Sequence, residues 1–224
     1  MKRILRLVIL IGAGTAIALI APFKAQAQES RFYLSGDLGG AFTEADVKFD
    51  PGVRAGFAGG YQITDWVAAE AQLGATINSV ARGLDFFIVT RTGNGGYLLF
   101  HDITFANVPL LFNVKLQYPN RSPWAPYIGG GLGVSAAILD ADTERGPDVS
   151  RIIRAHATEA EAVFAYQAFA GLSCRLNDRL KISVEYRYLA AESPQWTIDT
   201  DGGALLTFGP IKTHTISLAL DYRF

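Results

Sequence analysis

The sequence predicts an all-β protein, specifically an eight-stranded antiparallel transmembrane β-barrel. Three observations favour this fold class. The mean hydropathy of +0.19 is high for a water-soluble protein, and 50% of the 224 residues are hydrophobic. After the first 27 residues, apolar side chains alternate with polar ones, which is the period of a β-strand. The connections between the alternating segments are short and long in turn, as in outer-membrane barrels.

The first 27 residues have the pattern of a secretory signal peptide. Three basic residues lie within the first six positions, residues 7–23 carry no charge, and an Ala-Gln-Ala cleavage pattern ends at Ala27. An N-terminal membrane anchor is the alternative, but the apolar run is short for a bilayer span. We therefore expect a signal peptide at residues 1–27 and a barrel domain at residues 28–224.

Composition excludes several other classes of protein. The single cysteine, Cys174, rules out an intramolecular disulfide framework and a cysteine-based zinc cluster. A formal net charge of -1 argues against a basic nucleic-acid binder. The longest charge-free stretch after the signal, residues 122–139, contains two prolines and four glycines, so it is a poor candidate for a transmembrane helix.

The first four alternating segments span residues 32–42, 52–63, 66–76 and about 102–118. We expect one face of each to be apolar and to point outward, with these residues: Phe32, Leu34, Leu38, Phe42, Val53, Ala55, Phe57, Tyr61, Ile63, Val67, Ala69, Ala71, Leu73, Val108, Leu110, Phe112, Val114, Leu116 and Tyr118. The start of the fourth segment is less regular, so we expect a bulge to shift its phase near Ala106 and Asn107.

The last four alternating segments span residues 126–138, 161–176, 180–188 and 211–224. Their expected outward faces are Ile128, Leu132, Val134, Ala136, Phe164, Tyr166, Ala168, Ala170, Leu172, Leu180, Ile182, Val184, Tyr186, Tyr188, Ile216, Leu218, Leu220, Tyr222 and Phe224. Segment 180–188 is the most regular, because every second residue is large and apolar. Eight strands of about ten residues are long enough to span a bilayer.

The connections alternate in length. Short ones lie at residues 64–65, 119–125 and 177–179, and longer polar ones lie at about 43–51, 77–101, 139–160 and 189–210. Backbone polar groups cannot remain unpaired in lipid, so a spanning sheet must close on itself. A soluble β-sandwich is the alternative, since its strands also alternate.

Two sets of residues favour the barrel over the sandwich. Aromatic residues gather near the short-turn ends, as an interfacial girdle does: Tyr61, Trp66, Tyr118, Trp124 and Tyr222. The polar faces carry charges that we expect to pair as a network inside the barrel: Arg54, Glu70, Lys115, Arg175, Glu185 and Arg187. An eight-stranded barrel is normally filled by side chains. A narrow conduit is the alternative, because inward glycines on segment 126–138 leave space for water.

The last seven residues, Leu-Ala-Leu-Asp-Tyr-Arg-Phe, resemble the terminal strand of Gram-negative outer-membrane proteins. Residues 126–133 and 108–114 are also similar to those of the small OmpA-like and opacity porin-type barrel family. This resemblance implies that Tyr222 and Phe224 form the signal that the barrel-assembly machinery recognises. It also implies a cell outer membrane location, with outer-membrane lipid and lipopolysaccharide as surroundings and a surface ligand bound through the extracellular loops.

We expect a structural or adhesive role in the cell envelope, without a cofactor, a metal or a nucleic-acid partner. A small porin-like channel and a lipid A-modifying enzyme are the alternatives. Catalysis would need a histidine beside a nucleophile and a carboxylate. The three histidines, His101, His156 and His214, match no such motif, so we do not expect an enzyme. Apolar runs at residues 86–89 and 97–100 predict a hairpin above the membrane, whose exposed edge could pair with a partner strand.

Overall fold

The fold is a closed barrel of eight antiparallel strands. The structure, a computed structural model, describes residues 31–45, 49–79, 85–89, 95–120, 122–143, 157–198, 204–207 and 209–224. The predicted signal peptide at residues 1–27 lies outside the described residues. The barrel strands are β1 (Phe32–Glu44), β2 (Gly52–Gln62), β3 (Val67–Ser79), β5 (Gly95–Gln117), β6 (Trp124–Thr143), β7 (Ala157–Arg175), β8 (Leu180–Ala191) and β11 (Ile211–Arg223).

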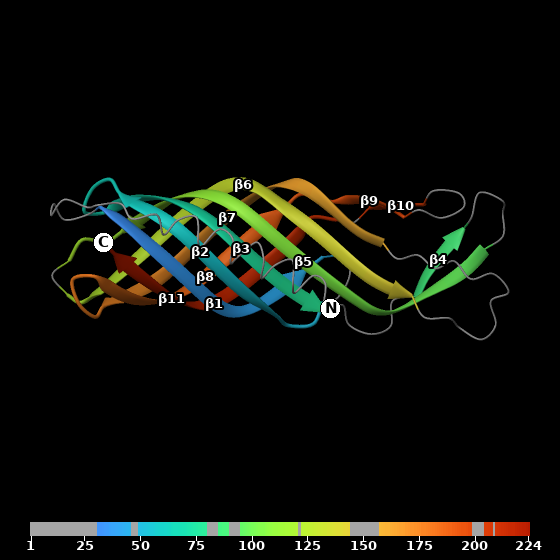
Figure 1. The fold of residues 1–224 in the computed structure, drawn as a ribbon, viewed down its shortest axis with the longest axis horizontal. Coiled ribbons are helices and arrows are strands. Elements are labelled where there is room, and N and C mark those ends of the chain that lie inside the picture. The colour runs from blue at the N-terminus through green and yellow to red at the C-terminus, as the bar shows by residue number, and fades with distance from the viewer. Residues whose placement is uncertain are drawn as a thin grey trace.

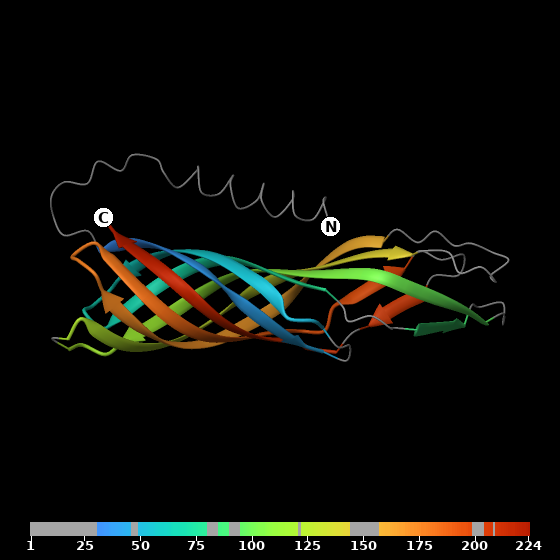
Figure 2. The ribbon, with the colours of Figure 1, turned by 90° about the horizontal axis from the view of Figure 1, so that it is seen from below.

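Each barrel strand pairs with its sequence neighbour, and the last strand pairs with the first. The ring closes because β11 pairs with β1. The short strand β4 (Asp85–Val89) lies between β3 and β5 in the sequence, but β3 pairs directly with β5 in the ring. Figures 1 and 2 show the strands running obliquely along the long axis of the molecule. The C-terminus lies at one end, and β4 lies at the other with β9 (Gln195–Ile198) and β10 (Ala204–Thr207). The predicted fold class is therefore confirmed.

The two-residue period places one face of each strand in the lumen and the other outside. On β8, the side chains of Ser183, Glu185 and Arg187 are buried, whereas Ile182 and Val184 are exposed on the outer wall. The same alternation holds along β1 and β11. Because the outer face is apolar and the inner face polar, the barrel is arranged for lipid outside.

The fourth barrel strand keeps one phase where the sequence predicted a shift. Phe105, Asn107 and Leu111 all face inward, and pairing with β6 is continuous from Asp102 to Gln117. The expected bulge near Ala106 and Asn107 is therefore wrong. The register with β6 is irregular instead between Phe100 and Asp102, which precede the part of β5 that pairs with β3.

Short connections are held by local hydrogen bonds. Thr64 Oγ1 accepts a hydrogen bond from the backbone N–H of Val67 at 3.1 Å. Asn177 Oδ1 accepts from the N–H groups of Arg179 and Leu180 at 2.9 and 2.8 Å. A side-chain oxygen that receives backbone N–H groups stabilises a tight turn. These connections occupy residues 63–66, 118–123 and 176–179 and lie at the end of the barrel near the C-terminus.

Several strands continue beyond the barrel wall at the opposite end. β5, β6 and β7 have 23, 20 and 19 residues, about twice the length that crosses a bilayer. The predicted hairpin is present, because β4 pairs with the start of β5 from Asp85 opposite Leu99 to Val89 opposite Gly95. A second hairpin, β9–β10, lies in the connection before β11.

Among the residues that the structure describes, no helix is long and apolar enough to cross a membrane.

Candidate functional site in the barrel lumen

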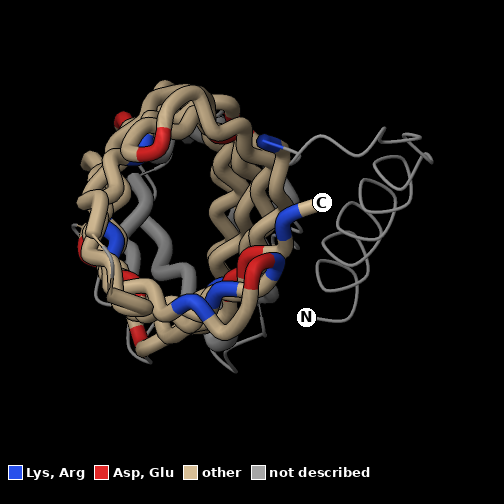
Figure 3. Tube along the Cα trace, turned by 90° about the vertical axis from the view of Figure 1, so that its left-hand side faces the viewer, with Lys and Arg blue, Asp and Glu red and all other residues tan. Residues whose placement is uncertain are grey.

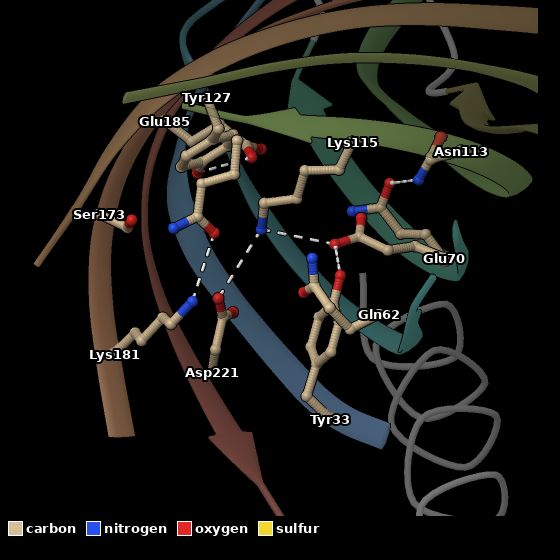
Figure 4. Close-up of polar contacts among 12 residues, drawn as sticks. Tyr33, Gln62, Glu70, Asn113, Lys115, Tyr127, Ser173, Lys181, Glu185 and Asp221 are labelled. Carbon is tan, nitrogen blue, oxygen red and sulfur yellow. Dashed lines mark hydrogen bonds and ion pairs between the residues drawn. The ribbon is translucent and has the colours of Figure 1, made fainter. Parts of the chain in front are cut away.

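Lys115 of β5 lies at the centre of a charged cluster in the part of the lumen nearest the short turns. Its Nζ is 3.4 Å from Glu70 Oε1 of β3 and 3.7 Å from Asp221 Oδ2 of β11. Figure 4 shows the lysine extending between these two carboxylates. The Lys115 Nζ also lies over the Tyr127 ring, 4.3 Å from its centroid, and Tyr33 donates a hydrogen bond to Glu70 Oε1 at 2.5 Å. This buried cation is therefore surrounded by carboxylates and π-faces, as its desolvation requires.

Arg187 of β8 holds a second cluster farther along the lumen. Its Nε donates to Glu185 Oε1 at 3.0 Å, and its Nη1 donates to Gln167 Oε1 at 2.7 Å and to Gln72 Oε1. Gln167 Nε2 in turn donates to Asn113 Oδ1 at 2.6 Å. The Arg187 guanidinium lies over the ring of Phe169 of β7, 5.0 Å from its centroid. Strands β3, β5, β7 and β8 are thus cross-linked through one arginine.

A further buried ion pair joins the neighbouring strands β1 and β2. Arg54 of β2 is 1% exposed, and its Nε donates to Asp37 Oδ2 of β1 at 3.0 Å. Asp37 Oδ1 accepts a longer contact, 3.4 Å, from Gln72 Nε2. Asp37 therefore connects the Arg54 pair to the Arg187 cluster through Gln72, and these two groups form one polar layer.

Inward glycines receive large side chains from neighbouring strands. A Cβ at Gly171 would lie 2.5 Å from the hydroxyl of Tyr127, and one at Gly129 would clash with the ring of Phe169. A Cβ at Gly131 would clash with the Asn113 amide. The expected water-filled space beside the glycines of segment 126–138 is therefore wrong at Gly129 and Gly131, because Phe169 and Asn113 side chains occupy it.

The part of the lumen toward the long connections contains a cluster of buried apolar side chains. The cluster consists of Phe105, Leu111, Ala137, Val163, Ala165, Leu189, Ala191 and Ile211, with Ala45 and Phe49 packed against it. Phe49, from the connection after β1, packs its ring 5.4 Å from that of Phe105. We call this cluster the apolar plug; its apolar surface disfavours water and ions in the outer part of the lumen.

Little free volume remains between the charged clusters. A cavity lined by Asp37, Glu70, Gln72, Lys115, Glu185 and Arg187, among others, has about 10 Å³ of space for water. A single water molecule needs about 10–15 Å³ by the same measure. This part of the lumen is therefore filled by side chains.

Five of the six charges predicted for the interior lie in the lumen, and Arg175 does not join them. Arg175 has the inward parity of β7, but it is the last residue of that strand and its side chain is exposed at the short-turn end. The alternating pattern tells which face of a strand a residue occupies, but not how deep along the barrel axis it lies. It therefore could not separate Arg175 from Arg187.

Several residues of the site were not singled out by the sequence. Tyr33, Gln72, Asn113, Tyr127 and Gln167 hold the charged side chains, and all five are buried. Each has the inward parity of its strand and a polar group. A search for every polar or phenolic residue of that parity would have found them, whereas a search for charges alone could not.

Of the predicted interfacial aromatics, Tyr61, Trp124 and Tyr222 lie on the outer wall, and Trp66 and Tyr118 lie in the short connections. Tyr61, Trp66, Tyr118, Trp124 and Tyr222 are each at least 39% exposed and lie near the short turns. The C-terminal Phe224 is also exposed, with its ring at 90° to that of Tyr222 and 5.4 Å away. An outward ring at this level suits the boundary between lipid and water.

His214 lies on the outer wall of β11, outside the lumen. Its Nδ1 is 2.7 Å from the hydroxyl of Tyr186, and its ring is 5.2 Å from that of Tyr188. His156 and the side chain of His101 lie outside the described part of the chain. Within the described ranges, no three His, Cys, Asp or Glu side chains are grouped to hold a metal ion.

Known proteins of this architecture match the chain. The family model described as "Outer membrane protein beta-barrel domain" matches residues 11–224. No curated protein matches the chain. Neisserial surface protein A (NspA) is similar in structure, with 14% identity and a TM-score of 0.58, over 88% of this chain and 99% of that one. The outer membrane protein OprG from Pseudomonas aeruginosa has 12% identity and a TM-score of 0.54, over 90% of this chain and 99% of that one. At these identities the two structures support the fold alone.

Proposed function

The chain belongs to the outer membrane protein beta-barrel domain family, and from this premise we propose that it is a filled, non-conducting barrel with a structural or adhesive role in the envelope. The family places the barrel in the outer membrane. The short turns then face the periplasm and the long connections face the cell exterior, as in other outer-membrane barrels.

The filled lumen is the observation that carries this proposal. The Lys115–Asp221 ion pair joins β5 to β11, and the Arg187–Gln72 hydrogen bond joins β8 to β3, so both cross the lumen. The apolar plug around Phe105 lies beyond them. An ion that crossed the barrel would have to displace both layers. Rigid cross-links between opposite walls support a structural role more than transport.

We expect the refolded full chain to give no reproducible conductance steps in a planar lipid bilayer. The physical reason is that the cavity at the level of Lys115 and Arg187 holds about one water molecule at most. Heat-dependent mobility on a gel would verify that the sample is folded. A triple variant, Phe105→Ala, Lys115→Ala and Tyr127→Ala, removes bulk from both levels and serves as the positive control. Stepwise conductance by the wild-type chain would favour the porin-like alternative.

The exterior hairpin supports the adhesive part of the proposal. β4 pairs on one side with β5, and its other edge is unpaired in the part of the chain that the structure describes. An open edge offers backbone N–H and C=O groups to an extended partner strand. The β4 sequence, Asp-Phe-Phe-Ile-Val, carries one charge, so few side chains oppose such pairing.

The structural role and the adhesive role can be tested separately in cells. We expect a strain without the protein to take up more N-phenyl-1-naphthylamine, a hydrophobic dye, because the envelope loses a rigid barrel. Both the wild-type chain and a chain with residues 85–99 replaced by a Gly/Ser loop should restore the barrier. Only the wild-type chain should restore adherence to a protein-coated surface. If neither dye uptake nor adherence changes in the strain without the protein, the proposed role is wrong.

The proposed role is not enzymatic. His214 lies on the outer wall with a tyrosine as its hydrogen-bond partner, whereas hydrolytic catalysis requires a nucleophile and an orienting carboxylate beside the histidine. This arrangement supports an interfacial position for His214, where an aromatic cluster meets the outer boundary of the lipid.

A further inference from the structure

Basic side chains gather at the periplasmic mouth of the barrel. A pocket there is lined by Lys115, Arg179, Lys181 and Arg223, with Asp178 and Asp221 as its carboxylates. The lining is therefore net positive by two, in a chain whose formal net charge is -1. Figure 3, which looks at this end, shows basic segments beside the C-terminus.

Most of this positive charge lacks a carboxylate partner. Lys115 is paired with the carboxylates of Glu70, at 3.4 Å, and Asp221, at 3.7 Å. Within the described residues, Arg179, Lys181 and Arg223 make no ion pair, and the hydrogen bond of Lys181 Nζ is to the neutral Gln117 Oε1 at 3.3 Å. Like charges in one pocket repel each other, so their grouping is unfavourable unless an anion is present.

Lys181 lies among several of these basic groups. Its side chain is partly buried. The charges of Arg223, Lys115 and Arg175 repel its ammonium group, and Asp221 is the carboxylate that attracts it. The strand register places Lys181 directly between Asp221 of β11 and Arg175 of β7. Its Nζ nevertheless extends across the mouth to β5, as the hydrogen bond to Gln117 shows.

The pocket has donors of the kind that bind an oxyanion. About 20 Å³ of its space is open to water, enough for one water molecule or one oxygen atom of an anion. The cations of Lys181 and Arg223 line that space, and the exposed Arg179 lies at its edge. Gln62 also lines it, but its amide nitrogen already donates to the carbonyl oxygens of Thr64, at 2.6 Å, and Val67, at 3.3 Å. Guanidinium groups bind phosphate oxygens in pairs, and an ammonium group adds a point charge.

The geometry points to a phosphate-binding site at the periplasmic mouth, formed by Arg179, Lys181 and Arg223. The ligand is a phosphate group that reaches the mouth from the periplasmic side. A soluble phosphate compound and the headgroup of an inner-leaflet phospholipid share this chemistry. The site is independent of the exterior hairpin, so it adds a ligand to the barrel whatever the hairpin binds.

Calorimetric titration with inorganic phosphate tests the site. The full chain is refolded in a phosphate-free detergent at fixed ionic strength, because exposed charges are screened by salt. We expect saturable binding by the wild-type chain and about tenfold weaker binding by Lys181→Gln and by Arg223→Gln, since each loses a charge-assisted hydrogen bond. Lys212→Gln is the matched control, because Lys212 is an exposed lysine at the opposite end of β11, and its affinity should stay within about twofold.

Two results would overturn the proposal. One is the absence of saturable phosphate binding by the folded wild-type chain, with folding checked by heat-dependent gel mobility. The other is an equal effect of Lys181→Gln and Lys212→Gln, which would indicate only a diffuse ion atmosphere.

A second titration, in nanodiscs with and without phosphatidylglycerol, distinguishes the two sources of the phosphate group. Competition by the anionic lipid identifies a headgroup as the ligand, and unchanged phosphate affinity identifies a soluble compound.

Discussion

Arg187→Met is expected to lower the free energy of unfolding by about 3–5 kcal/mol, the usual cost of breaking a buried ion pair from one side. The substitution leaves Glu185, which is 5% exposed, as a buried carboxylate without its cation. It also removes the donor that joins Gln72 and Gln167 across the lumen. Urea unfolding in phospholipid vesicles, followed by tryptophan fluorescence, measures the change.

The matched control for this prediction is Arg175→Met. Both arginines have inward parity, but Arg175 is exposed at the mouth, so its loss should change stability by about 0.5 kcal/mol or less. A double variant, Arg187→Met with Glu185→Gln, should recover part of the loss. It removes the unpaired charge and keeps an acceptor oxygen for the Tyr127 hydroxyl, which donates to Glu185 Oε2 at 3.0 Å. Equal losses for Arg187→Met and Arg175→Met would contradict the buried network.

Leu218→Arg is expected to destabilise the barrel in lipid by about 2–4 kcal/mol, the cost of a cation at the bilayer midplane on the lipid-facing wall. Leu218 is 59% exposed on the outer face of β11 and pairs with Leu38 and Val184. It lies midway along β11 between His214 and Tyr222, which are near the two boundaries of the apolar band.

Ile63→Arg is the control for the lipid-facing position. Ile63 is 47% exposed and adjoins the short turn after β2, where an arginine reaches water, so the expected cost is about 0–1 kcal/mol. The same unfolding measurement in vesicles compares the two variants. If Leu218→Arg and Ile63→Arg cost the same, the outer wall of β11 does not face the hydrocarbon at Leu218.

The sequence by itself determined the barrel and the face of most strand residues, the start of β5 excepted. A strand turns successive side chains to opposite sides, so the local order of residues 180–188 was enough to place Glu185 inside and Val184 outside. Residues 177–179 likewise predicted their turn, because an asparagine side chain can bind the backbone two residues ahead. These features depend on neighbours in the chain, which the sequence contains directly.

Only the tertiary structure decided which inward residues meet and how deep they lie. Arg54 pairs with Asp37, and Lys115 pairs with both Glu70 and Asp221, which is 106 positions away. Such contacts depend on the register of eight strands and on closure between β1 and β11, and no local pattern specifies either one. The same reason explains why Phe169 fills the space over Gly129 and why Arg175 remains in water. Periodicity reports the direction of a side chain, whereas depth and partner follow from the assembled barrel.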